Sequence, residues 1–318
     1  MAESGKIIFD AACGNGLKVA GFFNPSDASE IKGVIQICHG MSEYYSRYAQ
    51  MIERFNQAGY HVVGIDMLGH GQSYYANDTE ANPKGYLGPG KDSWKNILKD
   101  VMHMHGEAVN RFGKDMKYIL YGHSMGSFVC RSIFLTPEYS AEFDGFVFAS
   151  TMGPNPAVGL AKFLAGAGCA FGSEKKVNKL LTNLSFGSYL KRIPNPKTPN
   201  DWLSTDQSEV DAYRADPMLG FSFTSGGFRT LFNIVGYIQS KQAYANIPDK
   251  PCFFAYGSED PVGNYGKGVE QVIARMRSCG ADPKSKNYGP YRHELQNESI
   301  REEYFADLID FADSVNRG

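Results

Sequence analysis

Short apolar runs alternate with helical segments along most of this chain of 318 residues. The runs that have the length and composition of buried strands span 32–38, 60–66, 117–121, 146–149, 251–256 and 284–288. The helical segments between and after them span 45–58, 92–112, 127–135, 228–240, 268–279 and 298–315. Strands that alternate with helices pair in parallel, because each helix returns the chain to the same edge of the sheet. The sequence therefore predicts an α/β fold with a mostly parallel central sheet flanked by helices.

The alternation breaks between residues 152 and 225, a segment rich in Gly, Pro, Asn and aromatic residues that has no strand-like run. Open α/β sheets bind ligands at the carboxyl ends of their strands, so we expect an inserted, mainly helical cap over that edge. The expected organisation is a first part of the core at 1–151, the cap at 152–225 and a second part of the core at 226–318. At the start of the chain, 6–12 and 17–23 indicate an antiparallel hairpin.

The most specific motif is Gly122-His123-Ser124-Met125-Gly126, which stands between a strand-like run and a helical segment. A serine between two glycines at a sharp strand-to-helix turn forms a nucleophile elbow. We expect one glycine to supply backbone freedom and the other to allow close approach. The turn lifts the Ser124 hydroxyl clear of the sheet. A serine that merely caps an ordinary helix is the competing interpretation.

A nucleophilic serine needs a histidine base and a carboxylate that orients the base. Of the seven histidines, only His293 follows Ser124 in the chain, and the order serine, acid, histidine is the one that accompanies a nucleophile elbow. Asp260 follows the run 251–256 directly and is the preferred acid. Glu259 is the competing candidate, and Asp216, inside the cap segment, is a poorer one.

An oxyanion hole needs two N–H donors that are already in position before the reaction. The N–H of Met125, directly after the nucleophile, is one expected donor. The second is the N–H of Met41, because Gly40 lets the backbone approach closely in the loop after the run 32–38. Other polar residues of these motifs are expected to brace loops (His39, Asp66, His70) or to point away from the serine (His123).

Composition argues against several other classes of protein. A net charge of −2 gives no electrostatic argument for a nucleic-acid partner or an anionic membrane surface. Six scattered cysteines without a Cys-x-x-Cys pair indicate reduced thiols in a cytoplasmic protein. We find no metal-binding pattern and no phosphate-binding Gly-rich loop, so no cofactor and no metal are expected. No run reaches the length of a transmembrane helix, and contact with a membrane surface is expected to be transient and through the cap.

Taken together, the motifs resemble the monoacylglycerol lipase and lysophospholipase branch of the α/β-hydrolases, also called the serine aminopeptidase S33 group. The resemblance rests on five stretches: 39–44, 66–73, 122–126, 257–260 and 293–294. It extends from about residue 30 to the end of the chain and matches the cap in position and size. It implies the α/β-hydrolase fold and a Ser-Asp-His ester hydrolase that acts on lipids with one acyl chain and needs no cofactor.

The leading hypothesis is therefore hydrolysis of monoacylglycerol-like or lysophospholipid-like esters. The cap contains an apolar run at 157–171, too short to span a bilayer. We expect its residues Leu160, Phe163 and Leu164 to face the substrate as a lid that binds the acyl chain. A cap helix packed on the core is the competing interpretation of this run.

Other activities remain open on the same scaffold: a small-ester esterase, a thioesterase, an acyltransferase and an aminopeptidase. An aminopeptidase would need cap carboxylates to hold the substrate's ammonium group, for which the candidates are Glu209, Asp211 and Asp216. Outside the enzymes, the alternative is a binding protein on a hydrolase scaffold that has lost catalysis. The intact serine, acid and histidine argue against it.

Overall fold

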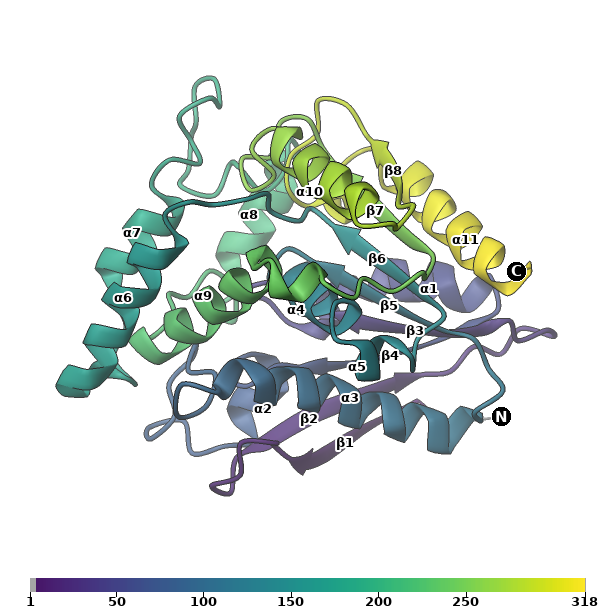
Figure 1. Ribbon diagram of the computed structural model, residues 1–318, viewed down its shortest axis with the longest axis horizontal. Coiled ribbons are helices and arrows are strands. Elements are labelled where there is room, and N and C mark those ends of the chain that lie inside the picture. Colours follow the sequence, from purple (N-terminus) through teal and green to yellow (C-terminus); the bar gives the residue numbers. More distant parts are fainter. Residues whose placement is uncertain (1–3, 318) are drawn as a thin grey trace.

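A computed structural model describes residues 4–317 and contains one eight-stranded sheet (Figure 1). The strands are β1 (Gly5–Asp10), β2 (Lys18–Asn24), β3 (Gly33–Cys38), β4 (Tyr60–Asp66), β5 (Tyr118–His123), β6 (Gly145–Ala149), β7 (Cys252–Tyr256) and β8 (Lys284–Asn287). Their order is β1-β2-β4-β3-β5-β6-β7-β8. The six strands from β4 to β8 pair in parallel, whereas β1 and β2 are antiparallel to their neighbours. The predicted mostly parallel sheet and the predicted hairpin are both confirmed.

Helices precede, connect and follow these strands. They are η1 (Tyr45–Tyr48), α1 (Ala49–Gln57), α2 (Gly71–Tyr75), α3 (Ser93–Phe112), α4 (Met125–Phe134), α5 (Pro137–Ser140), α6 (Val158–Gly168), the π-helical turn η2 (Cys169–Ser173), α7 (Lys179–Phe186), α8 (Gln207–Ala215), α9 (Ser225–Gln239), η3 (Gln242–Tyr244), α10 (Lys267–Ser278), η4 (Leu295–Asn297) and α11 (Arg301–Arg317). The expected helix at 45–58 begins as the 3₁₀ turn η1. The short helix α2 was not expected from the sequence, whereas α7 and α8 lie in the segment expected to be mainly helical.

The hydrophobic core has one part on each face of the sheet. Apolar side chains of α3, α4, α9 and α10 pack on one face. Those of η1, α1 and α11 pack on the other. Every residue of β3, β4, β5, β6 and β7 is buried, because helices cover both faces of these strands. This explains why their sequences are nearly continuous apolar runs.

The elements from α6 to α9 lie in the chain between the neighbouring strands β6 and β7. Helices α6 and α7 run side by side at the end of the molecule that is remote from both chain termini (Figure 1). The insertion also contacts the loop after β3. The carbonyl of Phe221, in the insertion, accepts a hydrogen bond from the hydroxyl of Ser42, in that loop, at 2.6 Å. Within residues 4–317, none of the helices has the length and hydropathy needed to cross a bilayer.

Candidate active site

Ser124, at the centre of the predicted elbow, lies between β5 and α4. It has φ 52° and ψ −121°, a conformation that few non-glycine residues adopt. Its N–H donates to the carbonyl of Ala149 in β6 at 3.0 Å, and its carbonyl accepts from the N–H of Ser127 at 2.8 Å. The Ser127 hydroxyl donates to the same carbonyl at 2.5 Å. These bonds hold a strained turn from both sides, while Ser124 stays partly exposed at the end of the strand.

The two glycines of the elbow both allow close approach. A Cβ on Gly122 would lie 2.3 Å from the carbonyl oxygen of Gly126, and a Cβ on Gly126 would lie 2.0 Å from that of Cys38 in β3. The expectation that one glycine supplies backbone freedom is wrong, since neither has a positive φ. Ser124 itself carries the unusual backbone conformation.

The parallel strands bring the predicted acid and base to one edge of the sheet. Asp260 follows β7 and His293 follows β8, and the Asp260 Oδ2 atom lies 3.0 Å from Nδ1 of His293. The second carboxylate oxygen, Oδ1, accepts from the N–H of Val262 at 2.9 Å. Asp260 and His293 are both buried, whereas Glu259 is exposed. The geometry therefore makes Asp260, and not Glu259, the partner of the histidine.

The surroundings of His293 favour its protonated form. Burial lowers the pKa of this imidazole, but the carboxylates of Asp260, Glu294 and Glu43 outweigh burial, so that the pKa is raised above its ordinary value. A raised pKa makes the imidazole a stronger base for a proton taken from a nucleophile.

Two rings pack against His293, and sequence reasoning placed neither of them there. The ring centroid of His123 lies 4.8 Å from that of His293, and the centroid of Trp202, from the insertion, lies 5.0 Å from it. His123, expected to point away from the serine, places its ring against that of His293. Burial and the charge of His293 lower the pKa of His123 to about 4, so that His123 is uncharged near neutral pH.

The loop after β3 passes beside the nucleophile. A Cβ on Gly40 would lie 3.3 Å from the Cβ of Ser124. Met41 comes next in this loop. On the other side, Met125 is the first residue of α4, and the first N–H groups of a helix have no acceptor within it. The two expected oxyanion donors therefore belong to segments that flank Ser124.

The bracing roles expected for three residues are confirmed. His39 donates from Nδ1 to the carbonyl of Gly40 at 2.7 Å and accepts at Nε2 from the N–H of Met67 at 2.9 Å. Both ring nitrogens are thus used, and His39 is not available as a base. Asp66 accepts hydrogen bonds from N–H groups in the first turns of η1 and α2, and His70 accepts one from the N–H of Ser42 in the loop after β3.

The apolar run at 157–171 was expected either to face the substrate as a lid or to pack on the core, and its residues do not all behave alike. Leu164 is partly buried and packs against the core, whereas the exposed fractions of Leu160 and Phe163 are 63% and 70%. Among residues 4–317, six of the eight exposed large hydrophobic side chains lie close together in the sequence: Leu160, Phe163, Phe171, Val177, Leu180 and Leu184. We call this set the apolar cap surface. One side of α6 is therefore core, and the other faces solvent.

The carboxylates that an aminopeptidase would need already have partners in the protein. Glu209 pairs with Arg301 of α11 at 3.2 Å. Asp216 accepts from the hydroxyl of Tyr44 at 2.5 Å, and Asp211 accepts from a side chain of its own helix. These contacts argue against a cluster of cap carboxylates that binds an ammonium group.

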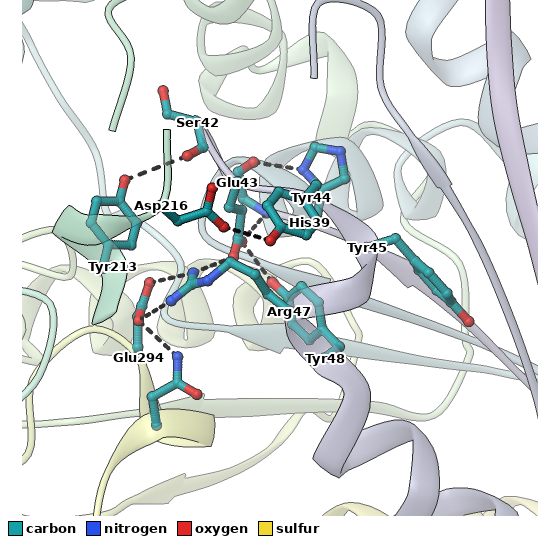
Figure 2. A network of polar contacts seen from close by, with 12 residues as sticks. His39, Ser42, Glu43, Tyr44, Tyr45, Arg47, Tyr48, Tyr213, Asp216 and Glu294 are labelled. Carbon is teal, nitrogen blue, oxygen red and sulfur yellow. Dashed lines mark hydrogen bonds and ion pairs between the residues drawn. The ribbon is translucent and has the colours of Figure 1, made fainter. Parts of the chain in front are cut away.

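Sequence reasoning also missed a buried ion-pair cluster beside the base, formed by Glu43, Arg47 and Glu294 (Figure 2). Two signals were present in the sequence. Glu43 and Arg47 are four residues apart, the spacing of one helical turn, and Glu294 directly follows the predicted base. The described residues contain no group of three or more His, Cys, Asp or Glu side chains arranged to hold a metal ion.

The sheet order, the elbow and the adjoining Asp–His pair define an α/β-hydrolase. Residues 29–300 match the family described as serine aminopeptidase, S33, and the chain belongs to that family. The resemblance inferred from the motifs is thereby confirmed.

Individual proteins are similar over most of the chain. A monoacylglycerol lipase of Mycolicibacterium smegmatis is 27% identical over 270 residues, which cover 84% of this chain and 83% of the relative. A monoglyceride lipase of Saccharomyces cerevisiae is 24% identical over 315 residues, 94% of this chain and 91% of the relative. The crystal structure of a highly thermostable carboxyl esterase from Bacillus coagulans, in complex with glycerol, has a TM-score of 0.91 and 26% identity. The match covers 99% of this chain and 100% of that one.

Proposed function

We propose that this protein is a serine esterase that cleaves carboxylic esters of single-chain lipids, monoacylglycerols or lysophospholipids, through an acyl-enzyme intermediate. The observation that carries the proposal is the 3.0 Å contact between Asp260 and His293 beside a serine on a strained elbow. The names of the relatives from Mycolicibacterium smegmatis and Saccharomyces cerevisiae support the substrate class.

In this mechanism the Ser124 Oγ atom attacks the ester carbonyl carbon while its proton passes to Nε2 of His293. Asp260 holds the other ring nitrogen, Nδ1, in its protonated tautomer and stabilises the imidazolium that forms. The carbonyl oxygen gains negative charge, which the N–H groups of Met41 and Met125 stabilise by hydrogen bonding.

The imidazolium of His293 then protonates the leaving alcohol, the glycerol or glycerophosphate part of the substrate, and the acyl group stays on Ser124. A water molecule repeats the sequence: His293 takes its proton, the water oxygen attacks the acyl carbon, and the bond from that carbon to Ser124 Oγ breaks as His293 returns the proton to Oγ. Every proton transfer is carried by side chains of this chain, so the mechanism uses no cofactor.

The apolar cap surface is the part of the protein that supports contact with lipid. We propose that it rests transiently on a membrane surface and that Leu160, Phe163 and Leu164 contact the acyl chain. Burial of this surface would be favourable, because the transfer of an apolar side chain out of water lowers the free energy. The same segment carries four exposed lysines that suit anionic head groups: Lys162, Lys175, Lys176 and Lys179. Six cysteines that form no disulfide support a reducing compartment such as the cytoplasm.

A fluorophosphonate probe tests the mechanism directly. The protein should be labelled at Ser124, and Ser124→Ala should abolish labelling and lower kcat by about 10⁴- to 10⁶-fold with the fold intact. If more than a tenth of the activity survives this substitution, the assignment of the nucleophile is wrong. A protein that is folded but not labelled would be a binding protein.

A substrate panel tests the specificity. Monoacylglycerols and lysophospholipids should be hydrolysed with higher kcat/KM than acetyl esters, acyl thioesters and aminoacyl amides. Preference for one of the other compounds would identify the protein as an esterase, a thioesterase or an aminopeptidase instead. Transfer of the acyl group to added alcohol in preference to water would identify an acyltransferase.

A further inference from the structure

The cluster of Glu43, Arg47 and Glu294 is tightly paired (Figure 2). Arg47 Nη1 lies 2.7 Å from Glu43 Oε2 and 2.8 Å from Glu294 Oε1, and Arg47 Nη2 lies 2.9 Å from Glu294 Oε2. The exposed fractions of the three side chains are 3% for Glu43, 11% for Arg47 and 4% for Glu294. Such a cluster offers little net stability, because its pairing must first offset the desolvation of three charges. Its two ends, however, touch two different parts of the candidate active site.

Glu43 holds the loop that contains the expected oxyanion donor. Its carboxylate accepts a short hydrogen bond from the N–H of Gly40, the residue before Met41, and another from the hydroxyl of Tyr48 at 2.7 Å. The Gly40 N–H and the Met41 N–H belong to consecutive peptide groups. The Glu43 carboxylate therefore holds the peptide group that adjoins the one carrying the Met41 N–H.

Glu294 holds the loop that contains the base. It follows His293 directly, and its N–H donates to the carbonyl of Leu203 in the insertion at 2.8 Å. Its carboxylate accepts from the side-chain amide of Asn297 at 2.8 Å as well as from Arg47. Fixed at both backbone and side chain, Glu294 restricts how His293 can move.

A ring from the insertion closes the cluster. The Arg47 guanidinium lies 5.0 Å from the ring centroid of Tyr213 in α8, and the Tyr213 hydroxyl donates to the carbonyl of Ser42 at 3.5 Å. The ring excludes water from the ion pairs and so strengthens them.

We propose that Glu43, Arg47 and Glu294 form a positioning unit that fixes the loop of Met41 relative to the loop of His293, so that oxyanion stabilisation and proton transfer act on one substrate carbonyl. None of the three is assigned a chemical step. The proposal rests on the proposed function, because it requires that Met41 and His293 act in the same reaction.

The unit also has an electrostatic consequence that a purely mechanical link would lack. Two carboxylates and one guanidinium leave it with a net charge of −1 near His293. The carboxylates that act on this imidazole are those of Asp260, Glu294 and Glu43, and the uncharged ring of His123 packs against it. Arg47 pairs with Glu43 and Glu294. The carboxylates of Glu43 and Glu294 raise the pKa of His293 in addition to the effect of Asp260. Removal of one carboxylate charge should therefore lower this pKa.

Three single variants separate position from charge, with p-nitrophenyl butyrate as the substrate. Glu43→Gln and Glu294→Gln keep the shape of the side chain and remove a charge. Each should lower kcat by about 10- to 100-fold, less than the ~10²- to 10³-fold expected for loss of an oxyanion donor, with KM within about threefold. The acidic limb of their kcat/KM profiles should move to lower pH. Arg47→Lys keeps the charge and removes the bidentate fork, so kcat should fall while the acidic limb stays where it is.

Glu209→Gln is the matched control, because it breaks an ion pair between α8 and α11 outside the cluster and should change neither kcat nor the pH profile. If Glu43→Gln does not fold, Tyr48→Phe removes one hydrogen bond from the same carboxylate and should give a smaller fall in kcat. Wild-type kcat and pH profiles in the folded cluster variants would overturn the proposal. If the wild-type protein is not labelled by fluorophosphonate at Ser124, the proposed function fails and the positioning role fails with it. Normal labelling with unaffected variants overturns the positioning role alone.

Discussion

A Cβ on Gly126 would lie 2.0 Å from the carbonyl oxygen of Cys38, so that the first turn of α4 rests directly on the end of β3. This contact sets the distance between the elbow and the loop that follows β3. Ser124, the proposed nucleophile, and Met41, the expected oxyanion donor, therefore lie on segments that meet at the same close contact.

Gly126→Ala should accordingly reduce both activity and stability. The methyl group meets backbone, which cannot rotate away, and overpacking of this kind costs about 1–3 kcal/mol of unfolding free energy. The variant should remain folded but lose activity, because the methyl group forces α4 to move away from the Met41 loop. Thermal unfolding and kcat measure the two effects. Gly106→Ala in α3 is the control, because nothing lies within 4 Å of its Cβ position and it should stabilise by about 0.5–1 kcal/mol.

Asp260→Asn should lower kcat by about 10⁴-fold, because an amide favours the wrong tautomer of the imidazole. Glu259→Gln should leave kcat unchanged, since Glu259 is exposed and only Asp260 contacts His293. Steady-state kinetics of both variants on one ester shows which carboxylate is the acid. A larger loss from Glu259→Gln than from Asp260→Asn would mean that the acid is misassigned.

Activity should rise with pH as His293 loses its proton, because only the neutral imidazole accepts the serine proton. The pKa of His293 is raised, so the midpoint of the rise in kcat/KM should lie above about 6.5, the ordinary value for histidine. A profile from pH 5 to 9 measures it. A midpoint below 6 would show that the neighbouring carboxylates do not act on this residue as the geometry requires.

Phe163→Asp tests the apolar cap surface. If Phe163 contacts the acyl chain, the variant should lose activity on long-chain esters even below their critical micelle concentration, where each lost CH₂ contact is worth up to about 0.8 kcal/mol. Acetyl esters should be little affected. A loss confined to vesicle-bound or micellar substrate would instead assign Phe163 to the membrane surface alone.

Two further substitutions complete the cap experiment. Leu164→Asp places a charge against the core and should reduce thermal stability as well as activity, in contrast to the exposed Leu160. Ile8→Asp is the control, because Ile8 is also a large exposed side chain but lies on β1. Equal losses on short and long esters by folded Leu160→Asp and Phe163→Asp proteins would exclude both residues from the acyl site.

Much of the core could be predicted because its signals are local. The strands β3 to β7 are continuous apolar runs, since each is covered on both faces, and the elbow is a five-residue motif with a strand before it and a helix after it. The order serine, acid, histidine along the chain then sufficed to place Asp260 beside His293, although they are 33 residues apart.

The parts that were missed depend on contacts between distant segments. Helix α7 has Leu180 and Leu184 one turn apart, but both face solvent and Leu181 is the buried leucine, so its apolar spacing does not mark the face that packs on the core. Arg47 and Glu294 are 247 residues apart, and no local pattern reports their pairing. The packing of His123 on His293 was missed because elbow geometry was considered only for the direction of the serine.

The insertion between β6 and β7 leaves and re-enters the sheet at adjacent strands. Because β6 and β7 pair in a fixed parallel register, the separation of its two ends is also fixed. The entropy lost in closing a chain segment grows only logarithmically with its length, about 0.6 kcal/mol for each doubling. The part of the insertion that does not contact the core or the candidate active site can thus change in length at little entropic cost and without a change in strand register. Ser124, Asp260 and His293 all follow strands of the sheet, so such a change in length leaves their places at the strand ends unaltered.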